Sequence, residues 1–131
     1  MCCQNPLLFN KGIKMKLLRT KEAMIFEKLF PREYKSFGCG PGGIGDWLVP
    51  DTMWGLSVRD ACRQHDHDYR FGSGSSEGHR KQCDDRLRLN MLIIVNEKSK
   101  TKTFKALRHI RIHTYYFWVR VAGSRSYWRE R

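Results

Sequence analysis

The sequence predicts a mainly α-helical fold built on two long antiparallel helices that carry the candidate site. A glycine-rich loop precedes the first of them, and a short N-terminal helix and a third, C-terminal helix complete the fold. Three observations predict it. Residues 57–71 contain no glycine or proline, residues 77–96 carry apolar side chains at helical spacing, and polar connectors at 72–76 and 98–102 follow them. A chain of 131 residues forms one domain with a modest core.

The chain begins with a basic segment, residues 1–18, which we expect to form a loose arm ahead of a domain of residues 19–131. Residues 20–30 predict a short amphipathic helix that Thr20 caps and Pro31 ends. Its predicted apolar face consists of Ala23, Phe26, Leu29 and Phe30.

A long loop is predicted next, because residues 37–55 hold six glycines, two prolines and two tryptophans. Ser57 is placed to cap the first long helix, which we expect to reach about Phe71. The second long helix is predicted from Glu77 to about Asn96. Its predicted apolar stripe consists of Leu87, Met91 and Ile94.

The third helix is predicted from Thr103 to about Ala122, and we expect Gly123 to end it. Its first half is basic and its second half is aromatic. An aromatic and basic segment suits nucleic acid or a membrane interface, but one apolar face can equally pack on the core. The residues alone leave these interpretations open.

The charge balance indicates the class of partner. Lysine and arginine outnumber aspartate and glutamate by 25 to 13, which gives a net charge of +12. Such a charge favours nucleic acid or membrane surfaces with anionic lipid. No apolar run approaches the roughly 20 residues of a membrane-spanning helix, and the first residues lack the regions of a signal peptide.

The residues with the clearest chemical potential are His65, Asp66 and Tyr69. On a helix, His65 and Tyr69 lie on one face at i, i+4, and Asp66 is rotated by about 100° toward a neighbouring loop. A neutral imidazole beside an oxygen-ligated cation is able to activate water against an ester. A lone His-Asp pair is more often a surface or structural feature, so the interpretation depends on the surrounding residues.

The glycine-rich segment, residues 38–45, is one such surrounding feature. Glycine lets the backbone turn its carbonyl oxygens inward, and calcium takes six to eight oxygen ligands, so carbonyls, Asp66 and waters form a suitable set. A plain connecting loop is the alternative. A phosphate-binding loop is disfavoured, because no Lys-Ser or Lys-Thr follows the glycines.

Asp84 precedes Leu87 and Met91 at i+3 and i+7, which places its carboxylate at the edge of the core-facing side. An inward carboxylate needs a partner, and an imidazole N–H on the facing helix is suitable. Alternatively, Asp84 and Asp85 are charges near a helix N-terminus. The residues favour neither interpretation.

Zinc is a further alternative, since Cys39, Cys62, His65 and Cys83 are ligand types. Their spacings match no paired structural zinc finger. Zinc would also leave Asp66 and the glycines unexplained. The five cysteines are an odd number, so at least one thiol is expected outside any intramolecular disulfide.

These motifs together resemble the secreted phospholipase A2 superfamily. The resemblance rests on Cys39-Gly-Pro-Gly-Gly43, on Cys62-x-x-His65-Asp66-x-x-Tyr69, and on an aspartate in the next helix. Among the members of the superfamily, the divergent ones from viruses, phages and bacteria have the most similar motifs. The likeness spans about residues 37–92, and a weaker similarity covers residues 103–122.

The resemblance implies a role for each matching residue. His65 would be the general base that deprotonates the water attacking the sn-2 ester, and Asp84, preferred over Asp85, would orient it. Tyr69 would brace Asp84 by a hydrogen bond.

The resemblance also implies a calcium site. Asp66 would give the carboxylate ligand, and the carbonyl oxygens of Gly38, Gly40 and Gly42 would complete the protein's share. The Gly40 N–H would join calcium in stabilising the oxyanion.

The sequence departs from the family in three places. Gly38 stands where many members have tyrosine, which matters little because the ligand is a carbonyl. About seven extra residues separate the loop from the helix, and they are expected to form an apolar lip for lipid. The lip residues are Trp47, Leu48, Val49 and Trp54.

The third departure concerns cysteines. Only the family disulfide between Cys39 and Cys62 can be rebuilt, and Asp68 stands where the family has a cysteine, so Cys83 is expected to stay a thiol. Packing must then supply most of the stability, and a reducing environment becomes tolerable.

The favoured function is therefore calcium-dependent hydrolysis of the sn-2 ester of glycerophospholipids by a monomer at a membrane surface, with anionic lipid preferred. Nucleic acid is disfavoured as a partner. Action outside the cell, in a virion or on a target membrane is favoured over residence in the cytoplasm. The alternative is a non-catalytic basic module of the same fold that binds anionic membrane or nucleic acid.

Overall fold

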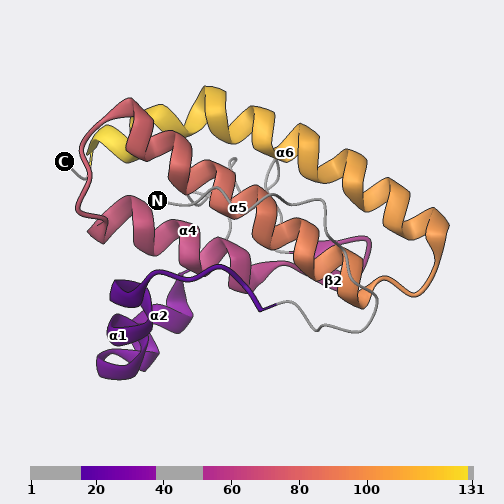
Figure 1. Ribbon diagram of the computed structural model, residues 1–131, viewed down its shortest axis with the longest axis horizontal. Helices are drawn as coiled ribbons and strands as arrows, with labels where there is room; N and C mark the ends of the chain where they lie inside the picture. Colours follow the sequence, from indigo (N-terminus) through magenta and orange to yellow (C-terminus); the bar gives the residue numbers. More distant parts are fainter. Residues whose placement is uncertain (1–15, 38–51, 130–131) are drawn as a thin grey trace.

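The computed structural model describes residues 16–37 and 52–129 (Figure 1). Their elements are α1 (Lys21–Leu29), α2 (Pro31–Ser36), β1 (Thr52–Met53), β2 (Leu56–Ser57), α4 (Arg59–Phe71), α5 (Glu77–Lys98) and α6 (Lys102–Arg129). The three long helices lie side by side, with α5 between α4 and α6, and the short α1 and α2 sit below one end of α4 (Figure 1). The mainly helical fold and the packed pair of site helices are confirmed.

The short N-terminal helix forms where it was predicted. The Thr20 hydroxyl accepts a hydrogen bond from the Ala23 N–H at 3.2 Å, as expected of an N-cap. Pro31 does follow its end, but it also opens α2, because proline suits the first position of a helix. The predicted apolar face is half wrong: Ala23 is buried, whereas Leu29 and Phe30 are exposed.

The last residues of the predicted arm belong to the packed structure. The Leu18 N–H donates to the Asn90 side-chain oxygen at 2.6 Å, and the Asn90 amide donates to the Leu18 carbonyl at 2.9 Å. Leu17 packs against the main core. The approach to α1 is thereby tied to the middle of α5.

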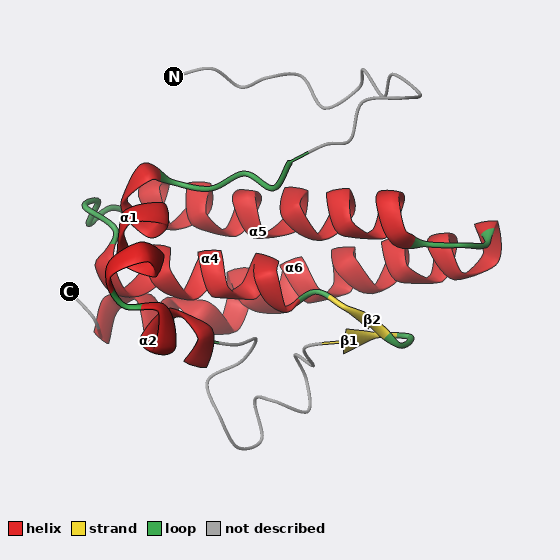
Figure 2. Ribbon diagram, turned by 90° about the horizontal axis from the view of Figure 1, so that it is seen from below, coloured by secondary structure: helices red, strands yellow, loops and turns green. Residues whose placement is uncertain are grey.

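The predicted loop of residues 37–55 ends in a structure that the sequence did not indicate. β1 and β2 form an antiparallel hairpin in which Thr52 pairs with Ser57 and Met53 with Leu56. Ser57 therefore belongs to a strand, and α4 begins two residues later; the Ser57 hydroxyl still accepts from the Arg59 N–H at 3.4 Å. Figure 2 shows the hairpin on one side of the helices, with α1 and α2 at one end.

The core lies where α4, α5, α6 and the hairpin meet. The predicted stripe of α5 is buried there, and α4, α6 and β1 supply the facing side chains. The buried members of this cluster are Met53, Val58, Ala61, Cys62, Leu87, Met91, Ile94, Val95, Ile112 and Tyr115. The apolar period of α5 therefore predicted its packing correctly.

The predicted end of the third helix is wrong, because α6 passes through Gly123 and continues to Arg129. A Cβ at position 123 would lie 3.0 Å from the Tyr69 hydroxyl oxygen, so glycine allows α6 to approach α4 closely. Beyond it, Tyr127 is fully buried and its hydroxyl bonds to the carbonyls of Gly74 and Ser76 at 3.2 Å each. Docking of the last turns thus outweighs the weak helix propensity of glycine.

None of the described helices is both long and apolar enough to cross a membrane.

Candidate active site

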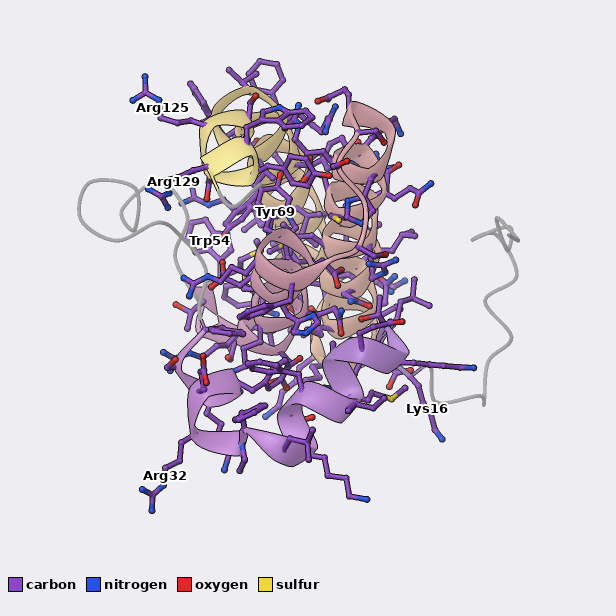
Figure 3. All side chains as sticks on the ribbon, turned by 90° about the vertical axis from the view of Figure 1, so that its left-hand side faces the viewer. Lys16, Arg32, Trp54, Tyr69, Arg125 and Arg129 are labelled. Carbon is purple, nitrogen blue, oxygen red and sulfur yellow. The ribbon has the colours of Figure 1, made fainter. Side chains whose placement is uncertain are left out.

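Three of the predicted site residues meet between α4 and α5. His65 Nε2 lies 2.8 Å from Asp84 Oδ1, and the Tyr69 hydroxyl donates to the same oxygen at 2.6 Å. His65 and Tyr69 reach this oxygen together because they are one turn apart on α4, and their rings lie 4.1 Å apart. Tyr69 sits in the middle of the molecule, between the helices (Figure 3).

Asp84, not Asp85, faces His65. The side chain of Asp84 is 0% exposed. Asp85 points to the surface, where it accepts hydrogen bonds from Lys81 at 2.6 Å and from Tyr116 at 2.5 Å. Both lie about two turns inside α5, so the interpretation of them as charges at a helix N-terminus is wrong.

The hydrogen bond fixes the state of the imidazole. Asp84 offers only an acceptor, so His65 Nε2 carries the hydrogen, and Nδ1 is the nitrogen that can take up a proton. The His65 side chain is 14% exposed, which leaves the ring a path to solvent. This arrangement suits a general base with an orienting carboxylate.

Tyr69 is a stable donor to this carboxylate. Burial, together with the negative charge of Asp84 and the hydrogen bond to it, raises the pKa of Tyr69 far above its ordinary value. The phenol is therefore favoured in its protonated form, which is the form that donates to Asp84.

Two arginines complete the surroundings of Asp84, and the sequence reasoning missed both. Arg120 of α6 donates to Asp84 Oδ2 at 2.6 Å, and Arg80 of α5 lies 3.6 Å from the same oxygen. Glu77 accepts hydrogen bonds from both guanidinium groups, and these bonds hold the pKa of Glu77 at about 2. The buried carboxylate of Asp84 thus faces two guanidinium groups in addition to His65 and Tyr69.

A sequence signal existed for one of the two arginines. Arg80 and Asp84 are four residues apart on one helix, a spacing that places opposite charges side by side. Arg120 lies thirty-six residues from Asp84, in a helix whose rotation relative to α5 is set by packing alone. No local pattern could have identified it.

Asp66, the predicted carboxylate ligand of calcium, lies at the surface of α4. Its side chain is 26% exposed, and Arg70 Nη2 approaches Asp66 Oδ2 to 3.8 Å. The other predicted ligands, Gly38, Gly40 and Gly42, lie outside the described residues, as do Cys39 and the predicted lip residues Trp47, Leu48 and Val49. The calcium cage, the Gly40 oxyanion contact and the Cys39–Cys62 disulfide stay predictions.

The zinc alternative gains no support from the described residues. Cys62 is buried in the main core, whereas Cys83 packs with Tyr69 and Tyr127, its sulfur 3.8 Å from His79 Nε2. Within residues 16–37 and 52–129 no three His, Cys, Asp or Glu side chains gather as a metal site would require.

Asp68, three residues after His65 on α4, is the centre of a buried polar cluster. It accepts hydrogen bonds from Gln64 at 2.8 Å and from Arg86 of α5. Burial alone would raise the pKa of Asp68, but the His67 imidazole, whose Nδ1 lies 3.7 Å from Asp68 Oδ1, and the charge of Arg86 more than offset it, so this pKa lies below its ordinary value. An ion pair thus joins α4 to α5 at this position.

The chain was compared with protein-family models, with curated proteins and with solved structures, and none of them matches. What the site can do is therefore inferred from its geometry and from the resemblance of its motifs.

Proposed function

We propose that this protein is a phospholipase A2, which hydrolyses the sn-2 ester of glycerophospholipids at a membrane surface in a calcium-dependent reaction. The observation that carries the proposal is the contact of His65 Nε2 and the Tyr69 hydroxyl with one buried oxygen of Asp84, at 2.8 and 2.6 Å. A structural histidine needs neither a fully buried carboxylate nor a second donor fixed against it.

His65 acts as the general base in this proposal. Its Nδ1 takes a proton from the attacking water, and Asp84 stabilises the resulting imidazolium and keeps the ring in place. The same proton is then available to the leaving alkoxide. Tyr69 and Arg120 hold Asp84 from opposite oxygens, so the carboxylate does not turn during the proton transfers.

The predicted ligands are all oxygen donors, the kind that calcium takes. Asp66 follows His65 directly, its carboxylate is part-exposed, and Arg70 is a long, exposed side chain that can move away from it. Asp66 and the carbonyl oxygens of Gly38, Gly40 and Gly42 would hold the ion. When bound, calcium supplies a Lewis acid that polarises the ester carbonyl.

The alternative is a basic module of the same fold that binds anionic membrane or nucleic acid without catalysis. One observation favours it: α6 contains no aspartate or glutamate from Lys102 to Arg129, and its outer face is exposed, basic and aromatic. The site residues favour catalysis, because a binding module gains nothing from a buried Asp84 held against His65 by Tyr69 and Arg120.

The deciding experiment measures fatty-acid release from phospholipid vesicles with calcium and with a chelator. We expect release that requires calcium and that falls by about 10²-fold or more in His65→Gln, the scale of general-base catalysis. Asp85→Asn is the matched control and should keep its activity. Activity that survives both chelation and His65→Gln would contradict the proposal.

A further inference from the structure

The tip of the β1–β2 hairpin holds a strained, exposed tryptophan. Trp54 has φ of +50° and Gly55 has φ of +77°, so both turn residues adopt left-handed backbone. Such a two-residue turn favours Asn-Gly, and a bulky residue at its first position carries a steric cost. Trp54 is nevertheless 58% exposed, so its ring does not compensate for that cost by burial.

The strained tip is fixed onto α6. The guanidinium group of Arg108 donates to the carbonyl of Met53 at 3.0 Å and to the carbonyl of Trp54 at 2.6 Å. Arg108 is itself nearly buried, which strengthens these charged hydrogen bonds. The backbone of Trp54 is therefore held in place by α6, while its ring stays exposed.

The face of α6 that includes Arg125 mixes basic with apolar side chains. At 100° per residue, its members lie within about 80° of one another around the helix. They are Leu107, Arg111, Trp118, Val121 and Arg125, and all are exposed. Trp54, Arg125 and Arg129 lie on the same side of the molecule (Figure 3).

We propose that Trp54 and this face of α6, together called the docking face, bind the surface of an anionic phospholipid bilayer. The choice of lipid as the partner rests on the proposed function. A tryptophan held at a projecting tip suits the boundary between headgroups and acyl chains, and arginines beside it suit anionic headgroups.

Charge and hydrophobicity together favour a bilayer over other partners. A second copy of this chain would bring two helices together that each carry basic residues and no acidic residue. Nucleic acid would pair with Arg111 and Arg125 but would leave Leu107 and Val121 in water. A bilayer interface accommodates both kinds of side chain at once.

The test uses the full chain with His65→Gln, so that binding is measured on vesicles that stay intact. Vesicles of equal parts phosphatidylcholine and phosphatidylglycerol are sedimented with the protein, and the bound fraction is measured. We expect Trp54→Asn to weaken binding by about tenfold, the scale of removing one large apolar side chain from an interface. Its melting temperature should be equal or higher, because Asn suits the turn.

Two further variants make the test specific. Ile25→Ser removes an equally exposed apolar residue, 58% exposed, from α1 on the opposite side of the molecule from α6 (Figure 1), and it should bind like the parent. Arg125→Gln should weaken binding and lower its dependence on salt. Full binding by Trp54→Asn, or an equal loss in Ile25→Ser, would overturn the proposal.

The remaining outcomes separate docking from catalysis. Vesicle binding that requires Trp54, in a chain that releases no fatty acid, supports the docking face and rejects the enzyme. Hydrolysis of a dispersed short-chain lipid without vesicle binding supports the enzyme and rejects the docking face. Binding of duplex DNA without binding of vesicles, or a dimer that Trp54→Asn dissociates, would also overturn the docking face.

Discussion

At the scale of single residues, Asp84 decides what the candidate site can do. One of its oxygens accepts from His65 and Tyr69, and the other accepts from Arg120. A carboxylate that orients an imidazole must itself be held, and here donors on α4 and α6 hold a carboxylate of α5. The site therefore depends on the packing of α4, α5 and α6 together.

Replacing Asp84 should separate orientation from folding. We expect Asp84→Asn to lower fatty-acid release by about 10²- to 10⁴-fold, because the amide no longer fixes the tautomer of His65. It should also lower the free energy of unfolding by about 3 kcal/mol, since Arg80 and Arg120 lose a buried partner. Asp85→Asn, measured in parallel by lipolysis and urea unfolding, should change neither quantity much. Similar losses in both variants would show that Asp84 has no special role.

Asp68 should make stability depend on pH in acid. Its pKa in the folded protein lies below the ordinary value of 3.8, so the folded state binds fewer protons than the unfolded state in that range. Its contribution is therefore complete above pH 3.8 and is lost as the pH falls through the folded pKa.

The matching variant is Asp68→Asn. It should cost about 2 kcal/mol at neutral pH, because Arg86 and Gln64 lose a charged acceptor. It should also flatten the fall of stability in acid, as followed by urea unfolding across a pH series. An unchanged acid profile would mean that other carboxylates dominate it.

At the scale of elements, α6 is long because its far end is anchored. Gly123 permits the close approach to Tyr69, and Tyr127 then bonds to the connector between α4 and α5. The helix therefore reaches across the site and brings Arg120 to Asp84. A helix that ended at Gly123 would leave the connector without this anchor.

A double-mutant cycle tests this role of Gly123. Gly123→Ala should destabilise the protein by about 1 kcal/mol, since the new methyl group meets the fixed Tyr69 hydroxyl at 3.0 Å. In Tyr69→Phe that oxygen is gone and the next nearest atom is 3.6 Å away. There the same substitution should stabilise by about 0.5–1 kcal/mol through helix propensity.

The control for this cycle is Gly78→Ala in α5, where the added Cβ would meet nothing closer than 3.7 Å. It should be neutral or stabilising whether residue 69 is Tyr or Phe. Chemical denaturation of the variants gives the coupling energy. If the two substitutions at positions 69 and 123 change the free energy of unfolding additively, the steric contact between the new methyl group and the Tyr69 hydroxyl is excluded.

At the scale of the whole molecule, the net charge of +12 produces a long-range attraction toward anionic surfaces. The exposed arginines of α6 and the projecting Trp54 place charge and apolar surface on one side (Figure 3). Long-range attraction would bring an anionic surface toward this side, and the apolar contacts would hold it there.

Salt should therefore slow the proposed reaction on charged membranes. Screening acts over about 8 Å at physiological ionic strength, so added salt should lower fatty-acid release from anionic vesicles. Release from phosphatidylcholine vesicles should change much less. Arg111→Gln combined with Arg125→Gln should reduce the salt dependence without changing hydrolysis of a dispersed short-chain lipid. An equal salt effect on both kinds of vesicle would argue against electrostatic recruitment.

The sequence by itself determined the features that depend on local spacing. Helical periodicity located α1, α4 and α5, placed His65 and Tyr69 on one face, and chose Asp84 as the inward carboxylate once the family resemblance was considered. These features follow from 3.6 residues per turn and from which side chains avoid water.

Only the tertiary structure decided the features that depend on contacts between distant elements. It carried α6 past Gly123, brought Arg120 to Asp84, and set Trp54 in a left-handed turn held by Arg108. Each of these goes against or beyond a local preference, since glycine weakens a helix and tryptophan disfavours such a turn. Packing and buried charge pairs outweigh those preferences, and a single sequence contains no periodic signal of them.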